Sequence, residues 1–300
     1  MDSSAAEIQQ ARVIGFRERV LAYVELTKPR IAFMLVLTSA AGFYLASTGN
    51  FDWVLFANSM IGIALLAFGV ATLNQWVERR TDILMPRTAQ RPLPSGRLSA
   101  NEALIFGVLQ CVVAEIYLSS LINLLTAMLG IVVILGYVLV YTPLKTRSSA
   151  CTAIGAIPGA LPPLMGWTAA SGDITMAAWA MFVIQFLWQF PHFLAIAWLY
   201  REEYAKAGIL MLPVLEPEGR LTARQIVSFA FMLLVVSLAP FFLGLASIIY
   251  LIGATILGIW FFAESIRFAW RRTNELAKRL LLASVIYLPL LFILLILTKN

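Results

Sequence analysis

This 300-residue sequence has few of the residues that soluble proteins carry on their surfaces. Only 13% of its residues are charged and 61% are hydrophobic, whereas soluble domains have about a quarter charged. It has two cysteines, Cys111 and Cys151, which are far apart and have no histidine cluster nearby. This favours two small buried side chains over a metal site or a disulfide. The composition excludes an ordinary soluble domain and makes the lipid bilayer the expected surroundings.

We also expect no leader sequence at the N-terminal end. Residues 1–30 contain acidic side chains and precede a full-length apolar stretch, so we expect neither a cleaved signal peptide nor a long transit peptide. Residues 1–30 are predicted to form a cytoplasmic N-terminal segment and residues 31–300 a single transmembrane domain. The expected location is the inner (plasma) membrane of a bacterium, crossed several times.

The positive charges occur in a few short segments separated by apolar sequence. All 22 lysines and arginines except Lys299 lie within residues 12–30, 79–97, 145–147, 201–224 and 267–279. About 45 to 55 residues separate neighbouring clusters, which is enough for two spans of ~20 residues and a tight turn. Because basic loops stay on the cytoplasmic side, a nucleic-acid partner is not expected despite the net charge of +6.

The pattern therefore predicts an all-α polytopic membrane protein with nine transmembrane helices around a central cavity. The N-terminus is expected in the cytoplasm and the C-terminus outside. The expected spans are 31–46, 53–74, 102–119, 121–141, 152–168, 176–199, 226–243, 248–264 and 280–297. Residues 155–166 place three prolines and three glycines in the fifth span, which predicts a kinked or broken helix that either lines a cavity or serves packing.

The strongest chemical signal follows the second span. Asn74, Glu78 and Asp82 are spaced four apart, so on a continuing helix they form one stripe of oxygen ligands. Mg²⁺ prefers such oxygens together with substrate phosphates. Arg87 and Arg91 follow with the same spacing, and guanidinium groups match phosphate geometry. The alternative is an interfacial loop whose charges pair with one another and with lipid headgroups.

A second group of polar residues surrounds the sixth span. Its inner end carries Glu202 and Glu203, which could face the first motif across the cavity, and Lys145 and Arg147 add charge from the fourth span. His192, the only histidine, lies about two turns inside the sixth span, where an ionisable group predicts function. It could ligate a haem iron, bind a propionate or carry a proton, or it could be a helix-packing residue. Glu115, within the third span, poses the same choice.

Together these motifs resemble those of the UbiA-type intramembrane prenyltransferases, and within them the branch that modifies haem. The resemblance covers the chain from residue 24 onward. The matching residues are Asn74, Glu78, Asp82, Met85, Arg87, Thr88, Arg91, Pro92, Leu93 and Gly96; Tyr141, Thr142 and Lys145; Ile154, Gly155, Pro158, Gly159, Pro162 and Pro163; and Trp188, Pro191, His192, Phe193, Met211, Leu212 and Pro213.

The resemblance implies transfer of the farnesyl group of farnesyl diphosphate to the vinyl group of haem B, giving haem O. It implies Mg²⁺ bound by Asn74, Glu78 and Asp82, with Arg87, Arg91 and Lys145 as catalytic partners. The further binding residues that it implies are His192, Arg147, Tyr200, Glu203 and Tyr204. A haem A synthase is a candidate partner.

The sequence departs from the family pattern in two places. Tyr200 and Tyr204 stand where the broader family carries a second pair of aspartates, so a second metal would need Glu202 or Glu203. After Lys145 the chain has Thr146 and Arg147 where the haem branch has Arg and Asn, and Cys151 lies near the expected Asn.

Two alternative functions remain. One is an aromatic prenyltransferase of quinone or chlorophyll biosynthesis, and the other is a secondary transporter with polar residues near the midplane.

Overall fold

The computed structural model describes residues 14–300, and these residues form helices without any strand. A single bridge between Ala246 and Lys299 is the exception to helical pairing in this region. The elements are α1 (Phe16–Leu26), α2 (Pro29–Ala46), α3 (Trp53–Asp82), α4 (Ala100–Leu121), α5 (Leu124–Ile134), the π-helix η2 (Leu135–Tyr141), α6 (Thr142–Leu144), α7 (Cys151–Ser171), α8 (Met176–Leu199), α9 (Arg201–Lys206), α10 (Leu212–Leu215), α11 (Arg220–Val236), α12 (Ala239–Phe242), α13 (Ile248–Arg271) and α14 (Asn274–Leu297).

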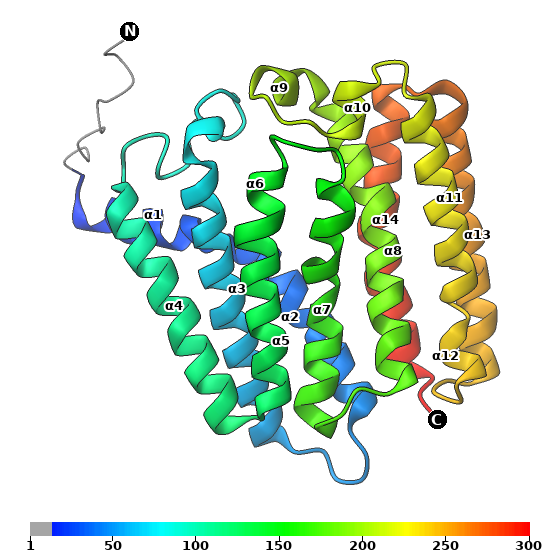
Figure 1. Ribbon diagram of the computed structural model, residues 1–300. Coiled ribbons are helices and arrows are strands. Elements are labelled where there is room, and N and C mark those ends of the chain that lie inside the picture. Colours follow the sequence, from blue (N-terminus) through cyan, green and yellow to red (C-terminus); the bar gives the residue numbers. More distant parts are fainter. Residues whose placement is uncertain (1–13) are drawn as a thin grey trace, which may run out of the picture.

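The long helices run side by side as a bundle, and α1 lies across them (Figure 1). Within residues 14–300, eight segments are long and apolar enough to cross a membrane, with α5 to α6 and α11 to α12 each counting as one segment. Large apolar side chains cover the outside of the bundle, including Ile105 (67% exposed) and Ile256 (63%). Such an apolar surface is unfavourable in water and is favourable in contact with lipid. The predicted all-α multi-pass membrane fold is confirmed; nine spans and the orientation of the termini stay predictions.

Polar residues in the turns explain where several helices begin. Asp52 accepts a hydrogen bond from the Leu55 backbone N–H at the start of α3. Ser99 and Glu102 form a reciprocal capping box at α4. Thr175 caps α8, which spans the predicted residues 176–199. Such caps satisfy backbone N–H groups that have no partner within the helix. Helix α3 continues beyond the expected span end at residue 74 to Asp82, as the stripe of predicted ligands requires.

Helix α7 is continuous through its three prolines, so the expected break is absent from this part of the chain. Pro163 cannot donate to the Gly159 carbonyl one turn earlier, and the Gln185 side-chain amide donates to that carbonyl at 2.9 Å instead. A Cβ on Gly166 would lie 1.8 Å from the Ser39 carbonyl oxygen of α2. The small residues therefore let α7 and α2 pack backbone against backbone, which is the packing interpretation of this stretch.

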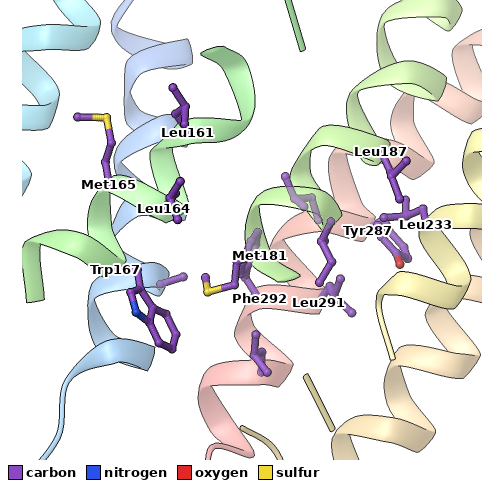
Figure 2. Packing of buried hydrophobic residues seen from close by; sticks show 14 of the residues in the cluster. Leu161, Leu164, Met165, Trp167, Met181, Leu187, Leu233, Tyr287, Leu291 and Phe292 are labelled. Atoms are coloured by element: carbon purple, nitrogen blue, oxygen red, sulfur yellow. The ribbon is translucent and has the colours of Figure 1, made fainter. Parts of the chain in front are cut away.

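The core of the bundle is apolar and continuous from α7 through α8 to α14. Figure 2 shows Trp167 of α7 on the side of that helix toward Met181 of α8, with Leu291 and Phe292 of α14 close to Met181. Both cysteines are buried and free, as the sequence predicts. The core therefore holds the helices together without a covalent link between them in the described residues.

Candidate active site

The continuous α3 places three predicted ligands on successive turns at one end of the bundle. Asn74, Glu78 and Asp82 all line a cavity of about 160 Å³. Asn74 and Asp82 are each only 1% exposed. Both polar side chains can be buried because each has polar partners within the protein, which buried polar groups require. The predicted stripe is therefore present, and it forms a wall of the cavity.

Basic side chains from two other segments form ion pairs with the two carboxylates. The Lys145 Nζ lies 2.5 Å from Glu78 Oε1, and the Arg91 Nη1 lies 2.7 Å from Asp82 Oδ2 and 3.8 Å from Glu78 Oε2. Burial alone would lower the pKa of Lys145, but the Glu78 carboxylate raises that pKa well above its usual value. Both acids are thus neutralised by cations that also line the cavity.

Lys28 is a third cation at the stripe, and it was missed in the site predicted from sequence. Its Nζ donates a 2.7 Å hydrogen bond to Asn74 Oδ1, and the Asn74 amide donates to Thr142 Oγ1 at 3.1 Å. Lys28 precedes Pro29 at the start of α2 in a left-handed conformation (φ 47°), which turns it toward α3. Burial, followed by the nearby Arg91, lowers the pKa of Lys28 to about 7. The sequence signal available was a lysine directly before a helix-starting proline.

Aromatic rings form the apolar part of the wall. The π-helix η2 places Tyr137 and Tyr141 in the cavity, and the Lys145 ammonium lies 4.4 Å from the centre of the Tyr141 ring. Phe193 of α8 and Tyr204 of α9 also line it. π-Helical segments are rare and frequently occur at functional sites. The cavity therefore combines cations, carboxylates and aromatic faces.

The remaining predicted residues are divided between the cavity and its surroundings. Arg87 lines the cavity and stacks on Tyr200, with its guanidinium carbon 4.8 Å from the ring centre. Arg147 is exposed in the loop after α6. Glu202 is exposed, and a buried carboxylate oxygen of Glu203 has no hydrogen-bond partner within residues 14–300. Neither glutamate is among the residues that line the cavity.

His192 faces a neighbouring helix. Its Nδ1 lies 2.8 Å from Ser284 Oγ of α14, and its ring stacks on Trp188 at 4.6 Å between centres. The next residues along α8, Phe193 and Ile196, line the cavity whereas His192 does not. Its Nδ1 is therefore occupied by helix packing, and Nε2 is the nitrogen left for a ligand.

Glu115 lies away from the cavity. Both of its carboxylate oxygens are buried without a hydrogen-bond partner in residues 14–300, and Oε1 is next to Gly130 of α5. In the described structure Glu115 therefore lies in the packing interface between α4 and α5. Its side chain does not contact the stripe.

The donor set fits a magnesium ion better than a transition metal. Across residues 14–300, no three side chains of His, Cys, Asp or Glu lie close enough together to hold a metal by themselves. The stripe offers two carboxylates and one amide oxygen beside three cations. Magnesium sites in phosphate-binding enzymes use one or two carboxylates and take other ligands from water and substrate phosphates. The stripe has this composition.

Comparison with known proteins identifies relatives across nearly the whole chain. Residues 35–296 match the model of the UbiA prenyltransferase family. The protoheme IX farnesyltransferase of Solibacter usitatus is 46% identical over 286 residues, covering 92% of this chain and 98% of the relative. The enzyme of the same name from Salinibacter ruber is 45% identical and covers 89% and 94% of the two chains.

Solved structures share the fold at low sequence identity. A structure described as digeranylgeranylglyceryl phosphate synthase superposes with a TM-score of 0.79 at 18% identity, covering 94% of this chain and 98% of the other. A UbiA homologue from Archaeoglobus fulgidus bound to DMAPP and Mg²⁺ superposes with a TM-score of 0.62 at 16% identity, covering 91% and 98%. The family predicted from the motifs is confirmed. This chain belongs to the UbiA prenyltransferase family.

Proposed function

We propose that this protein transfers the farnesyl group of farnesyl diphosphate to a vinyl group of haem B and thereby forms haem O, in the bacterial inner membrane. The observation that carries the proposal is the cavity in which Glu78 and Asp82 pair with Lys145 and Arg91, with Lys28 beside Asn74. The farnesyl donor and the haem acceptor are supported by relatives of 37–46% identity named protoheme IX farnesyltransferase.

Binding of the diphosphate requires positive charge that is already in place. Lys145 and Arg91 line the cavity and would contact the diphosphate oxygens, while Lys28 adds a donor beside Asn74. Magnesium held by Asn74, Glu78 and Asp82 would supply further positive charge against the leaving diphosphate. A neighbour with the same fold contains DMAPP and Mg²⁺, which supports a divalent ion here. Because the cations are fixed before substrate enters, they cost little reorganisation during the reaction.

The reaction breaks the bond between C1 of the farnesyl group and the diphosphate oxygen, and the diphosphate takes the electron pair. The resulting allylic cation is attacked by the terminal vinyl carbon of haem. A hydroxide equivalent from water then adds to the carbon next to the porphyrin, and one proton is released. Tyr137, Tyr141 and Phe193 surround the cavity with aromatic faces. These rings would shield the allylic cation from water until the vinyl group attacks it.

The haem would approach from the α8 side of the cavity. Phe193 and Ile196 line the cavity on this helix, and His192 lies beside them. We assign His192 Nε2 to haem contact, because Nδ1 is already bonded to Ser284. Haem O would then pass to a haem A synthase as a partner enzyme.

The acceptor is tested with purified protein and Mg²⁺. Farnesyl diphosphate is supplied together with haem B and with an aromatic acid acceptor of quinone biosynthesis in the same reaction. The expected product is haem B enlarged by one farnesyl group and one hydroxyl group, identified by its mass. A farnesylated aromatic acid with unchanged haem would contradict the proposal and establish the aromatic prenyltransferase alternative.

A further inference from the structure

A second hollow lies between α11 and α13, outside the candidate active site. It has a volume of about 390 Å³ and is open to the surroundings. Its rim carries Arg220 and Arg224 from the first turns of α11 and Arg272 from the end of α13. The two helices lie next to each other at one side of the bundle (Figure 1), and the hollow lies between the ends that carry Arg220 and Arg272. We call it the arginine groove.

The arginine groove is at the same end of the bundle as the candidate active site. Gly219, which precedes α11, packs against the Trp198 ring of α8 and the Arg272 side chain. A Cβ at Gly219 would lie 2.4 Å from Trp198, and its φ of 73° also favours glycine. This contact holds Arg220 and Arg272 close together at the predicted cytoplasmic surface.

The three arginines have little internal compensation. Within residues 14–300, Arg224 and Arg272 form no ion pair, and Arg220 pairs only with Glu218. The Arg220 and Glu218 side chains are 74% and 70% exposed, so water and salt screen this pair. The groove therefore carries excess positive charge that matches an anionic oxygen group.

The lower part of the groove is apolar and faces the membrane. Below the arginines, Val227 and Ala269 line it on the two helices. One turn further, Phe231 of α11 is 53% exposed and lies 5.8 Å from Phe262 of α13 between ring centres. Guanidinium groups above an apolar cleft between two helices suit a ligand that has an anionic head and an acyl chain.

We propose that the arginine groove binds an anionic phospholipid of the cytoplasmic leaflet. Its phosphate contacts Arg220, Arg224 and Arg272, and an acyl chain lies along Val227 and Phe231. The Ser228 hydroxyl, which also lines the groove, can donate to a glycerol or phosphate oxygen. The groove is distinct from the diphosphate cavity, since the two hollows share no lining residue.

The test measures retention of lipid by the full chain in detergent with native mass spectrometry. Phosphatidylglycerol and phosphatidylcholine with identical acyl chains are titrated against the parent protein. The groove variant is Arg220→Gln/Arg224→Gln/Arg272→Gln. The matched control is Arg80→Gln/Arg271→Gln/Lys278→Gln, which removes three exposed cations that do not line the groove. The single variant Arg224→Gln is included because it leaves both helix ends unchanged.

We expect the parent and the control to prefer phosphatidylglycerol. Each groove arginine contributes about fivefold, so affinity should fall about fivefold in Arg224→Gln and on the order of 100-fold in the triple variant. Equal binding of the two lipids by the parent would overturn the proposal. Unchanged retention in both groove variants would also overturn it. Complete displacement of the lipid by inorganic phosphate would show a simple anion site instead.

Discussion

At the scale of single residues, the candidate site is a set of paired opposite charges. Asp82 is 1% exposed and paired with Arg91, while Glu78 is paired with Lys145. Removing one partner of such a buried pair leaves a charge without compensation, which is strongly destabilising. Variants that keep the charge or the size of the side chain therefore separate function from stability better than alanine does.

Arg91→Lys keeps the charge and removes the planar fork. Because lysine is a point charge that cannot form two parallel hydrogen bonds, we expect farnesyl diphosphate affinity to fall about tenfold. Arg80→Lys is the control, since Arg80 is exposed near the end of α3 and does not line the cavity. Calorimetric titration measures the affinity. Parent-like affinity in Arg91→Lys would instead favour the interfacial-loop interpretation of Arg91.

His192→Ala tests the contact with haem. Loss of a ligand or hydrogen bond should weaken haem binding by about tenfold, while binding of farnesyl diphosphate with Mg²⁺ stays unchanged. Ser284→Ala is the matched control, because it removes the hydrogen bond to Nδ1, together with a local bond to the Leu281 carbonyl, and keeps the imidazole. Absorption spectra distinguish the roles: loss of iron ligation shifts the spin-state bands, and loss of a propionate contact does not. Unchanged affinity and spectrum in His192→Ala would make the histidine a packing residue.

The residue scale also shows why the site was only partly predictable from sequence. Asn74, Glu78 and Asp82 follow from a four-residue spacing on a continuing helix, and the structure places all three in the cavity. Lys28 lies 46 residues before Asn74 in the chain. Its position beside Asn74 depends on a left-handed backbone conformation that cannot be read from the sequence. The depth of His192 in a span does not determine which helix it faces. That direction depends on how α8 packs against α14.

At the scale of elements, α2 and α7 pack backbone against backbone at their small residues. Prolines in residues 155–166 predicted a kinked or broken helix; α7 is not broken, and Gln185 satisfies the Gly159 carbonyl that Pro163 cannot bond. The hydrogen-bond partner comes from another helix, so the spacing of prolines alone could not predict it. The glycines had a clearer meaning, since Gly42 and Gly166 occur where two backbones touch.

Gly166→Ala should therefore destabilise the protein although alanine favours helices. The new Cβ would lie 1.8 Å from the Ser39 carbonyl oxygen, which forces α2 and α7 apart. Overpacking of this kind costs about 1–3 kcal/mol. We expect a lower midpoint of thermal unfolding in detergent. Gly136→Ala is the control, because its Cβ would meet Pro158 at an ordinary 3.6 Å. Equal midpoints for the two variants would contradict this packing account.

At the scale of the whole molecule, the distribution of charge predicted the multi-pass helical fold because the bilayer limits the possible structures so strongly. The ends of the elements were less accurate: α11 begins at Arg220 and α14 at Asn274, whereas the expected spans begin at residues 226 and 280. Beyond the described residues, Arg12 of the N-terminal cluster contributes to the sequence argument alone. The orientation of the bundle rests on the positive-inside rule and is open to a direct test.

Single cysteines measure the orientation in intact cells. With Cys111 and Cys151 replaced by alanine, Asp173→Cys lies in the turn between α7 and α8, and Glu202→Cys lies in α9 at the other end. Both positions are exposed. We expect a membrane-impermeant maleimide to label Asp173→Cys directly and Glu202→Cys only after permeabilisation. The reverse pattern would place the candidate site on the outer surface.

The central claim is that the α3 stripe binds a prenyl diphosphate through a divalent ion. Calorimetry with the unreactive analogue farnesyl thiodiphosphate, with Mg²⁺ and with a chelator, tests it in the parent and in Glu78→Gln/Asp82→Asn. We predict that Mg²⁺ strengthens binding to the parent by about 100-fold and has little effect on the double variant, because the ligand carboxylates are gone. Binding to the parent that is equally strong without Mg²⁺, or a double variant that keeps the full effect of Mg²⁺, would contradict the claim.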